Sequence, residues 1–168
     1  MLLKNCTLLN DSFVFEKADM RIEGEEIKKI APAIEPYEGE EIIDAASKRV
    51  IPGLIDIHTH GSVGFDTCDN NAEGLLKITR FMAENGITSY LPTTMTLSKD
   101  MLKDIMKTVA EFKENQTEGC TVLGINMEGP YFSMAKKGAQ NGDYIMDPDF
   151  EHFKEIYDYC GGIIKIVG

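Results

Sequence analysis

The sequence predicts an α/β fold: a partial TIM (β/α)8 barrel of about four βα units, preceded by a small β-sandwich segment. Residues 1–50 contain short strand patterns with closely spaced turns, whereas strand and helix patterns alternate from Ile51 onwards. Alternation of this kind implies parallel βα units that lie side by side. A complete barrel typically needs about 250 residues, and only about 118 of the 168 residues remain after the first 50, enough for about half of one.

The first 50 residues are interpreted as short strands. Leu2-Leu3 begins the first strand, and the segments FVFEKADMRIEG, EEIKKIAPAI and EEIIDAASKRV follow it. Glu23-Gly24-Glu25 is typical of a hairpin turn. Because a layer this small encloses little core, we interpret residues 1–50 as the N-terminal part of a small β-sandwich and residues 51–168 as the first half of the barrel.

Four strands are expected after residue 50. The first is IPGLIDIHTHG, Ile51–Gly61, whose apolar run predicts a fully buried parallel strand. ITSYLPTTMT, CTVLGIN and IIKIVG are expected to form the other three. Glu128 and a long glycine-rich loop follow the third strand, and the fourth strand reaches Gly168.

Three helices are expected between these strands. Asn71 and Ser98 are predicted to cap the first two, Asn85-Gly86 to end the first, and Asp147-Pro148 to begin the third. The apolar residues at helical spacing predict the buried faces. These residues are Leu75, Leu76, Ile78, Phe81 and Met82 in the first helix, Met101, Leu102, Ile105, Met106, Val109 and Phe112 in the second, and Phe150, Phe153, Ile156 and Tyr157 in the third.

The composition excludes several classes of protein. With 17 Lys and Arg against 28 Asp and Glu, the net charge of −11 disfavours binding to nucleic acid or to anionic membranes. The four cysteines form no C-x-x-C pair, which argues against a zinc ribbon and favours a reducing compartment. Lys4 and Asn5 interrupt the apolar start before a signal-peptide core can form. We therefore expect a cytoplasmic protein.

Two of the three histidines lie at the end of the first barrel strand. Side chains alternate along a strand, so His58 and His60 are expected to point to the same side. Catalytic groups of βα-barrels lie at the carboxyl ends of the strands, where Thr93-Thr94 and Glu128 are also expected. Two imidazoles and a carboxylate suit a catalytic zinc, although H-x-H also occurs as ordinary solvent-facing residues. A divalent cation would likewise supply partners for polar groups beside a buried strand, including Asp56.

These segments resemble a known family. PGLIDIHTHG is similar to the first-strand signature of the amidohydrolase superfamily, and EGEEIIDAASKRVIPG resembles its lead-in, although Ser47 stands where glycine is usual. GINMEGPYFSMAKKGAQN closely resembles the metal-glutamate segment of the N-acetylglucosamine-6-phosphate deacetylases. The resemblance is to the N-terminal portion of that family and covers nearly the whole chain.

The resemblance implies a hydrolase of amino-sugar metabolism. Members hydrolyse the acetamide of N-acetylglucosamine 6-phosphate, giving glucosamine 6-phosphate and acetate. His58, His60 and Glu128 match metal ligands, and Gly138, Ala139 and Gln140 match the backbone that meets the sugar. The implied cofactor is a divalent metal, zinc or iron, because both accept imidazole and carboxylate ligands. For the complete protein we expect a homo-oligomer, a dimer.

The chain also departs from the family pattern. Asn126 stands where a histidine is common, and Gln140 stands where some members have another histidine. The family's other metal histidines, its catalytic aspartate and its phosphate-binding arginine match positions after the fourth strand, so the catalytic residues are unknown here. We do not assign phosphate binding to Lys136 or Lys137, because adjacent loop lysines are usually solvated.

Three hypotheses remain open at this point. The first is a portion of a metal-dependent deacetylase that is inactive by itself, because half a barrel leaves sheet edges and apolar surface uncovered. The second is a non-catalytic chain that binds metal or requires a partner. The third is another amidohydrolase activity on the same metal frame, such as cyclic-amide hydrolysis.

Overall fold

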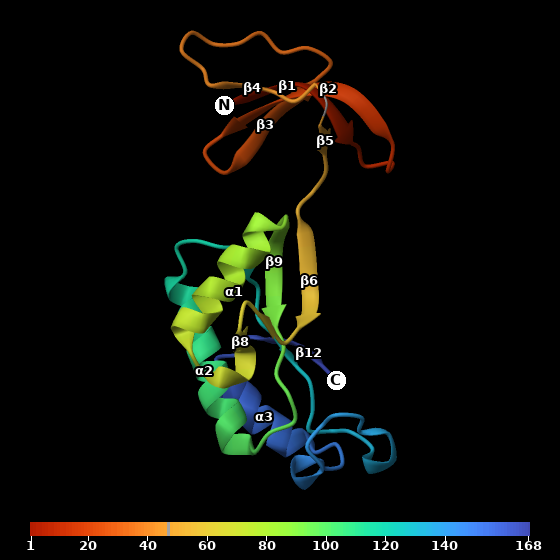
Figure 1. Cartoon of the computed structure of the whole chain (residues 1–168), viewed down its shortest axis with the longest axis vertical. Coiled ribbons are helices and arrows are strands. Elements are labelled where there is room, and N and C mark those ends of the chain that lie inside the picture. The colour runs from red at the N-terminus through yellow and green to blue at the C-terminus, as the bar shows by residue number, and fades with distance from the viewer. Residues whose placement is uncertain (47) are drawn as a thin grey trace. The chain divides into compact units, whose positions relative to one another are not determined.

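The computed structural model describes residues 1–46 and 48–168, so the departure noted at Ser47 lies outside the described residues. The chain divides into two compact units, Met1–Pro52 and Gly53–Gly168 (Figure 1). Each unit is described by itself below. No helix of the described residues is long and apolar enough to cross a membrane.

The first unit is built around one five-stranded sheet. Its path is β3-β2-β1-β4, and β5 also pairs with β1. The β2–β3 pair is an antiparallel hairpin in which Glu23 faces Glu26, and the left-handed Gly24 forms the predicted turn. The strands are β1 (Leu2–Leu9), β2 (Phe15–Glu23), β3 (Glu26–Ala31), β4 (Ile42–Asp44) and β5 (Arg49–Val50).

The second unit alternates strands and helices, as the sequence predicts. β6, β9 and β10 form a parallel sheet in the order β10-β9-β6, and β11 pairs in parallel with β12. A parallel bridge between Thr93 and Asn126 joins the two sheets. The described strands do not close into a barrel. The main elements are β6 (Leu54–Thr59), α1 (Ala72–Glu84), β9 (Ile87–Pro92), α2 (Lys99–Asn115), β10 (Thr121–Val122), β11 (Ile125–Met127), α3 (Phe150–Tyr159) and β12 (Ile164–Val167).

Several short elements were not expected from the sequence. The third barrel strand is split into β10 and β11 at Leu123-Gly124. Gly124 passes so close to the neighbouring backbone that a Cβ would lie 2.3 Å from the carbonyl oxygen of Ile163. The other short elements are β7 (Gly61–Ser62), β8 (Phe65–Asp66) and three 3-10 turns, at Thr67–Asp69, Met134–Lys136 and Gly142–Tyr144.

The helix boundaries follow local side-chain chemistry. Asn71 and Ser98 accept hydrogen bonds from the first backbone N–H groups of α1 and α2, as predicted. The start of α3 differs, because Asp149 rather than Asp147-Pro148 provides the cap. Phe150, which was predicted on the buried face, is 70% exposed because it lies at the first position of α3.

One continuous apolar core holds the second unit together. It forms between the inner faces of the helices and the strands that they cover. Phe81, Met101 and Tyr157, which are predicted on the buried faces of the three helices, are exposed instead. The core residues are Leu75, Ile78, Met82, Tyr90, Leu102, Met106, Val109, Cys120, Val122, Ile125, Met127, Ile156, Cys160 and Ile164.

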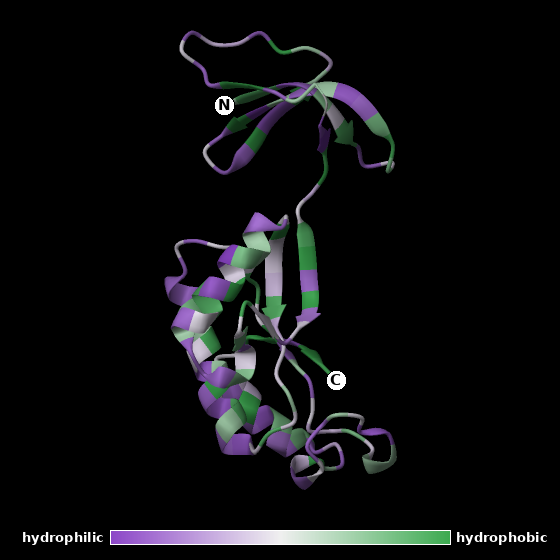
Figure 2. Cartoon of the chain, viewed as in Figure 1, coloured by the Kyte–Doolittle hydropathy of each residue, from purple (hydrophilic) through white to green (hydrophobic). Residues whose placement is uncertain are grey.

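The prediction that the histidine strand is fully buried is wrong for this chain. β6 is the edge strand of its sheet and pairs only with β9 among the described residues. Leu54, Ile55 and Ile57 are 55%, 61% and 53% exposed. Figure 2 shows hydrophobic and hydrophilic residues mixed along this strand. An apolar run indicates a capacity for burial, but burial of a parallel strand requires neighbours on both edges and both faces.

Candidate metal centre

The two histidines of H-x-H lie at the carboxyl end of β6. His58 belongs to the strand and His60 follows it directly. Their ring centroids are 5.4 Å apart, with the ring planes nearly perpendicular. The His58 side chain is 56% exposed and that of His60 is 32% exposed, so both imidazoles are open to solvent. The period of the strand therefore directs both rings to one region, as the spacing predicts.

Glu128 reaches the same region from another strand. It follows β11 directly, and the Thr93–Asn126 bridge fixes β11 beside β9, which in turn pairs with β6. Its Oε2 lies 2.8 Å from Nε2 of His58 and 3.2 Å from Nε2 of His60. One ligand atom from each of the three side chains lies within 4.8 Å of the others. No other group of this kind occurs among residues 1–46 and 48–168.

The ring of His60 is oriented by the neighbouring strand. Its Nδ1 lies 3.3 Å from the backbone oxygen of Thr93, immediately after β9. A carbonyl oxygen can only accept, so this contact favours the tautomer with the proton on Nδ1. Nε2 then carries a lone pair directed to the side where Glu128 lies. Histidines that bind metals usually have this arrangement, with the second ring nitrogen bonded to a carbonyl or carboxylate.

The Glu128 carboxylate divides its two oxygens between two environments. Oε1 accepts a hydrogen bond of 2.7 Å from Nε2 of Gln140. Oε2 is buried and has no hydrogen-bond partner among the described residues. A buried carboxylate oxygen without a partner is costly, and a cation beside two imidazole nitrogens would remove that cost. These three side chains therefore fit a divalent metal by both donor type and geometry.

The strand end that carries the histidines is held by polar residues. Asp56 accepts hydrogen bonds from the backbone N–H of His58 at 2.9 Å and from the hydroxyl of Thr59 at 2.7 Å. Asn126, which is buried, donates from Nδ2 to the backbone oxygen of Ile57 at 2.8 Å. The expectation that a cation satisfies Asp56 is therefore wrong, because the end of its own strand provides the partners. Asp56 and Asn126 instead hold the two polar atoms of the peptide group between Ile57 and His58, and Asp56 also holds the Thr59 hydroxyl.

The predicted sugar loop divides into exposed and buried residues. Gly138 and Ala139 are exposed, and Gly138 has a positive φ of 58°. Gln140 is 6% exposed and lies against Glu128. Lys137 donates from Nζ to the backbone oxygen of Gln140 at 2.8 Å, so its ammonium group is engaged in shaping this loop. Gly138 and Ala139 are thus the accessible part of the predicted contact.

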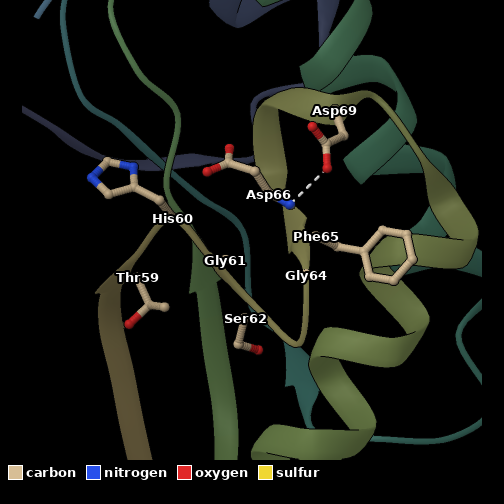
Figure 3. Close-up of a pocket in the computed structure, with 8 residues that line it drawn as sticks. All are labelled: Thr59, His60, Gly61, Ser62, Gly64, Phe65, Asp66 and Asp69. Atoms are coloured by element: carbon tan, nitrogen blue, oxygen red, sulfur yellow. Dashed lines mark hydrogen bonds between the residues drawn. The ribbon is translucent and has the colours of Figure 1, made fainter.

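A hollow of about 640 Å3 lies beside His60 (Figure 3). In this view the Asp66 carboxylate is directed toward the His60 side, whereas the Phe65 ring points away toward α1. Asp69 accepts a hydrogen bond from the backbone N–H of Asp66 at 2.8 Å. The sequence did not point to these two acids. The chain returns toward His60 through the β7–β8 hairpin, and strands of two residues each are too short to give a recognisable strand pattern. The lining residues are Thr59, His60, Gly61, Ser62, Gly64, Phe65, Asp66 and Asp69.

The third histidine is not part of the group of three. His152 of α3 is half-buried, and its Nδ1 lies 2.9 Å from Oη of Tyr131. Burial lowers the pKa of His152 and raises the pKa of Tyr131 to about 12. The ring of His152 is therefore bonded to the loop that follows Glu128.

Comparison with known proteins gives the same assignment as the sequence motifs. The sequence profile of the Amidohydrolase family matches residues 49–166. The N-acetylglucosamine-6-phosphate deacetylase of Lysinibacillus sphaericus is 34% identical over 165 residues, which are 98% of this chain and 42% of that protein. The N-acetylgalactosamine-6-phosphate deacetylase of Escherichia coli O157:H7 is 34% identical over 138 residues, which are 82% of this chain and 36% of that protein.

A solved structure extends the similarity to the fold. The crystal structure of N-acetylglucosamine-6-phosphate deacetylase from Pasteurella multocida matches 99% of this chain and 43% of its own, with a TM-score of 0.85 and 26% identity. The predicted resemblance to these deacetylases is thereby confirmed. The chain spans roughly two-fifths of the length of the relatives that it matches, 42% and 36% of the two named above.

Proposed function

The chain belongs to the amidohydrolase family, and from this premise we propose that it supplies the metal-binding part of an N-acetylglucosamine-6-phosphate deacetylase. The observation that carries the proposal is the convergence of His58, His60 and Glu128, in which one buried carboxylate oxygen has no hydrogen-bond partner among the described residues. The proposed reaction cleaves the acetamide C–N bond of N-acetylglucosamine 6-phosphate and releases glucosamine 6-phosphate and acetate.

Each part of the chain has a distinct role in this proposal. His58, His60 and Glu128 would hold the metal, either zinc or iron, which when bound supplies Lewis-acid activation of water and of the amide carbonyl. Asp56, Asn126 and the backbone of Thr93 keep the histidines in place. Gly138 and Ala139 would contact the sugar. The protonation steps are not assigned to any residue of the 168.

The domain assignment remains part of the proposal. We propose that residues 1–50 form part of a β-sandwich and that residues 51–168 form the first half of a metal-dependent barrel. The parallel order of β6, β9 and β10, together with the parallel β11–β12 pair, supports the second assignment. Because β6 is an exposed apolar edge, we expect the 168 residues alone to be inactive.

Metal analysis tests the site directly. The purified chain should bind one equivalent of Zn2+ or Fe2+, and His58→Ala should lower the bound fraction sharply because it removes one of three ligands. His152→Ala is the matched control, since it removes the histidine that lies outside the group and should leave metal content unchanged. Equal metal content in wild type and His58→Ala would contradict the proposed site.

Substrate profiling tests the reaction. Acetate release should be measured with the chain and, where the coding sequence continues beyond Gly168, with the longer product. N-acetylglucosamine 6-phosphate should be compared with its galactosamine epimer, with N-acetylglucosamine lacking phosphate, and with a dihydropyrimidine. Preference for the dihydropyrimidine would favour the cyclic-amide alternative. Metal binding without turnover of any of these by the longest product would favour the non-catalytic alternative.

A further inference from the structure

We propose that Gln140 is a positioning residue for Glu128: it holds one carboxylate oxygen so that the other faces the two histidines. This inference rests on the metal site proposed above and extends it to a residue that contributes no metal ligand. The sequence links Gln140 to the sugar loop only by its position in the family motif.

The contacts of Gln140 define the orientation of its amide. Oε1 accepts a hydrogen bond of 2.8 Å from the backbone N–H of Thr96, and Nε2 donates to Oε1 of Glu128 at 2.7 Å. A backbone N–H can only donate, so the amide oxygen must lie on the Thr96 side. The NH2 group is then directed at Glu128. The amide therefore connects the segment after β9 with the residue after β11.

The surroundings of Gln140 restrict it to this arrangement. The residue is 6% exposed, and the remaining near neighbour of Nε2 is the sulfur of Met95 at 3.8 Å. Gly129, directly after Glu128, packs against Thr96 so closely that a Cβ would lie 2.1 Å from Oγ1 of Thr96. The Thr96 segment and the Glu128 loop are thus in direct contact, and the Gln140 amide bonds to both.

This arrangement has a defined consequence for Glu128. A carboxylate joined to its backbone by rotatable bonds can turn either oxygen toward a cation. The donor from Gln140 fixes Oε1, and Oε2 remains within 3.2 Å of both Nε2 atoms. Hydrogen bonds to a charged acceptor are about twice as strong as neutral ones. Gln140 therefore preorganises the carboxylate to offer one oxygen, and it would act on the metal through Glu128 without being a ligand itself.

The test is the affinity of the 168-residue chain for Zn2+, measured by competition with a chromophoric chelator, with the visible spectrum of bound Co2+ as a second readout. Gln140→Met keeps the length of the side chain and removes both hydrogen bonds. We expect it to weaken Zn2+ binding by about 10- to 100-fold, the range typical of residues that support metal ligands, and to change the Co2+ spectrum. Gln140→His keeps a ring donor and acceptor, and its affinity should lie between those of wild type and Gln140→Met.

Gln116→Met is the matched control. Gln116 is also partly buried and also bonds through both ends of its amide, to the backbone of Glu118, Cys120 and Val122 at the start of β10. Among the described residues its hydrogen bonds go to this segment and not to Glu128, so its replacement should lower stability while leaving Zn2+ affinity within about twofold of wild type, as for independent sites.

The outcomes separate this inference from the function on which it rests. A wild-type chain that binds no metal overturns the metal site itself. A wild type that binds Zn2+ together with a folded Gln140→Met that binds it equally well overturns the positioning role alone. If Gln140→Met does not fold, Gln140→Thr replaces it in the test, because the shorter threonine side chain cannot reach both Thr96 and Glu128. A Gln140→Thr variant that binds Zn2+ as tightly as wild type, with an unchanged Co2+ spectrum, would then overturn the positioning role.

Discussion

The two units of this chain differ in how completely their buried charged side chains are hydrogen-bonded. In the first unit, Arg21 donates to both oxygens of Glu40, and both side chains are about 5% exposed. Asp19 accepts hydrogen bonds from Nζ of Lys4 and from the backbone N–H groups of Asn5 and Ile34. In the second unit, Glu128 is also largely buried, yet its Oε2 has no hydrogen-bond partner among the described residues and faces only the Nε2 atoms of His58 and His60.

This difference distinguishes structural charges from functional ones. A buried charge whose bonds are complete connects elements of the fold, and removing one partner leaves the other uncompensated. A buried charge with incomplete bonding lowers the stability of the empty protein and is retained where a ligand completes it. Arg21, Glu40 and Asp19 belong to the first class, and we propose that Glu128 belongs to the second.

The largest expected effect separates the two classes directly. Glu128→Gln keeps the shape of the side chain and an acceptor for Gln140, but removes the anionic ligand. We expect Zn2+ affinity to fall by at least about 100-fold, more than the loss of a supporting residue costs. The metal-free variant should be as stable as wild type or more stable, because an unsatisfied buried charge is removed.

Calorimetry with and without metal checks this prediction. At a metal concentration 100 times the dissociation constant, wild type should gain about 2.7 kcal/mol of unfolding free energy, and Glu128→Gln should gain almost none. A metal-free Glu128→Gln that is clearly less stable than wild type would show that Glu128 is a structural charge, like Glu40. The proposed distinction between the two units would then be wrong.

The second prediction concerns acid stability in the first unit. The hydrogen bonds from Arg21 lower the pKa of Glu40 from 4.5 to about 2. A carboxylate with a lowered pKa in the folded state stabilises the fold at pH values above 4.5, and this contribution is lost as the pH falls toward 2. Protection of the β1 and β2 amides from hydrogen exchange should decrease over that range.

Glu40→Gln is the corresponding variant. It should be less stable than wild type at neutral pH, because Arg21 loses its charged partner, and its protection should depend less on pH between 4.5 and 2. A wild type and a variant with the same acid dependence would mean that another carboxylate governs the acid stability of this unit.

The third prediction tests the support of His58. Asn126→Leu removes the buried donor to the backbone oxygen of Ile57. Leaving that oxygen without its partner should cost about 1–3 kcal/mol of unfolding free energy. Zn2+ affinity should also decrease, because Ile57 immediately precedes His58. Chemical denaturation and metal titration on the same samples would check both effects. A loss of stability with unchanged Zn2+ affinity would mean that Asn126 supports the fold but not the metal site.

The smallest effect is expected for a residue of the second unit that lies outside the site. Asn71 caps α1 by accepting from the backbone N–H groups of Glu73 and Gly74. Asn71→Ala should cost about 1 kcal/mol of stability, as is typical for the loss of a helix cap. Thermal unfolding would show the decrease, whereas Zn2+ affinity should stay the same. A change in affinity would mean that the metal site responds to any loss of stability.

The sequence predicts the site better than it predicts the surroundings of the site. His58 and His60 share a side because strand geometry has a period of two, and Glu128 joins them because parallel strands end at one edge. Both rules depend on local pattern alone. The orientation of the Gln140 amide and the partners of Asp56 are not predictable in this way, because they depend on contacts formed after the chain has folded.

The sequence by itself determined the order of the main strands and helices and which side chains we propose as metal ligands, because hydrophobic periodicity, capping residues and ligand chemistry act over a few residues at a time. Only the tertiary structure decided that β6 is an exposed edge, that Phe150 is left in solvent and that Oε2 of Glu128 has no hydrogen-bond partner among the described residues. Burial and hydrogen-bond satisfaction depend on neighbours that are distant along the chain, and their positions are fixed only when the strands and helices pack.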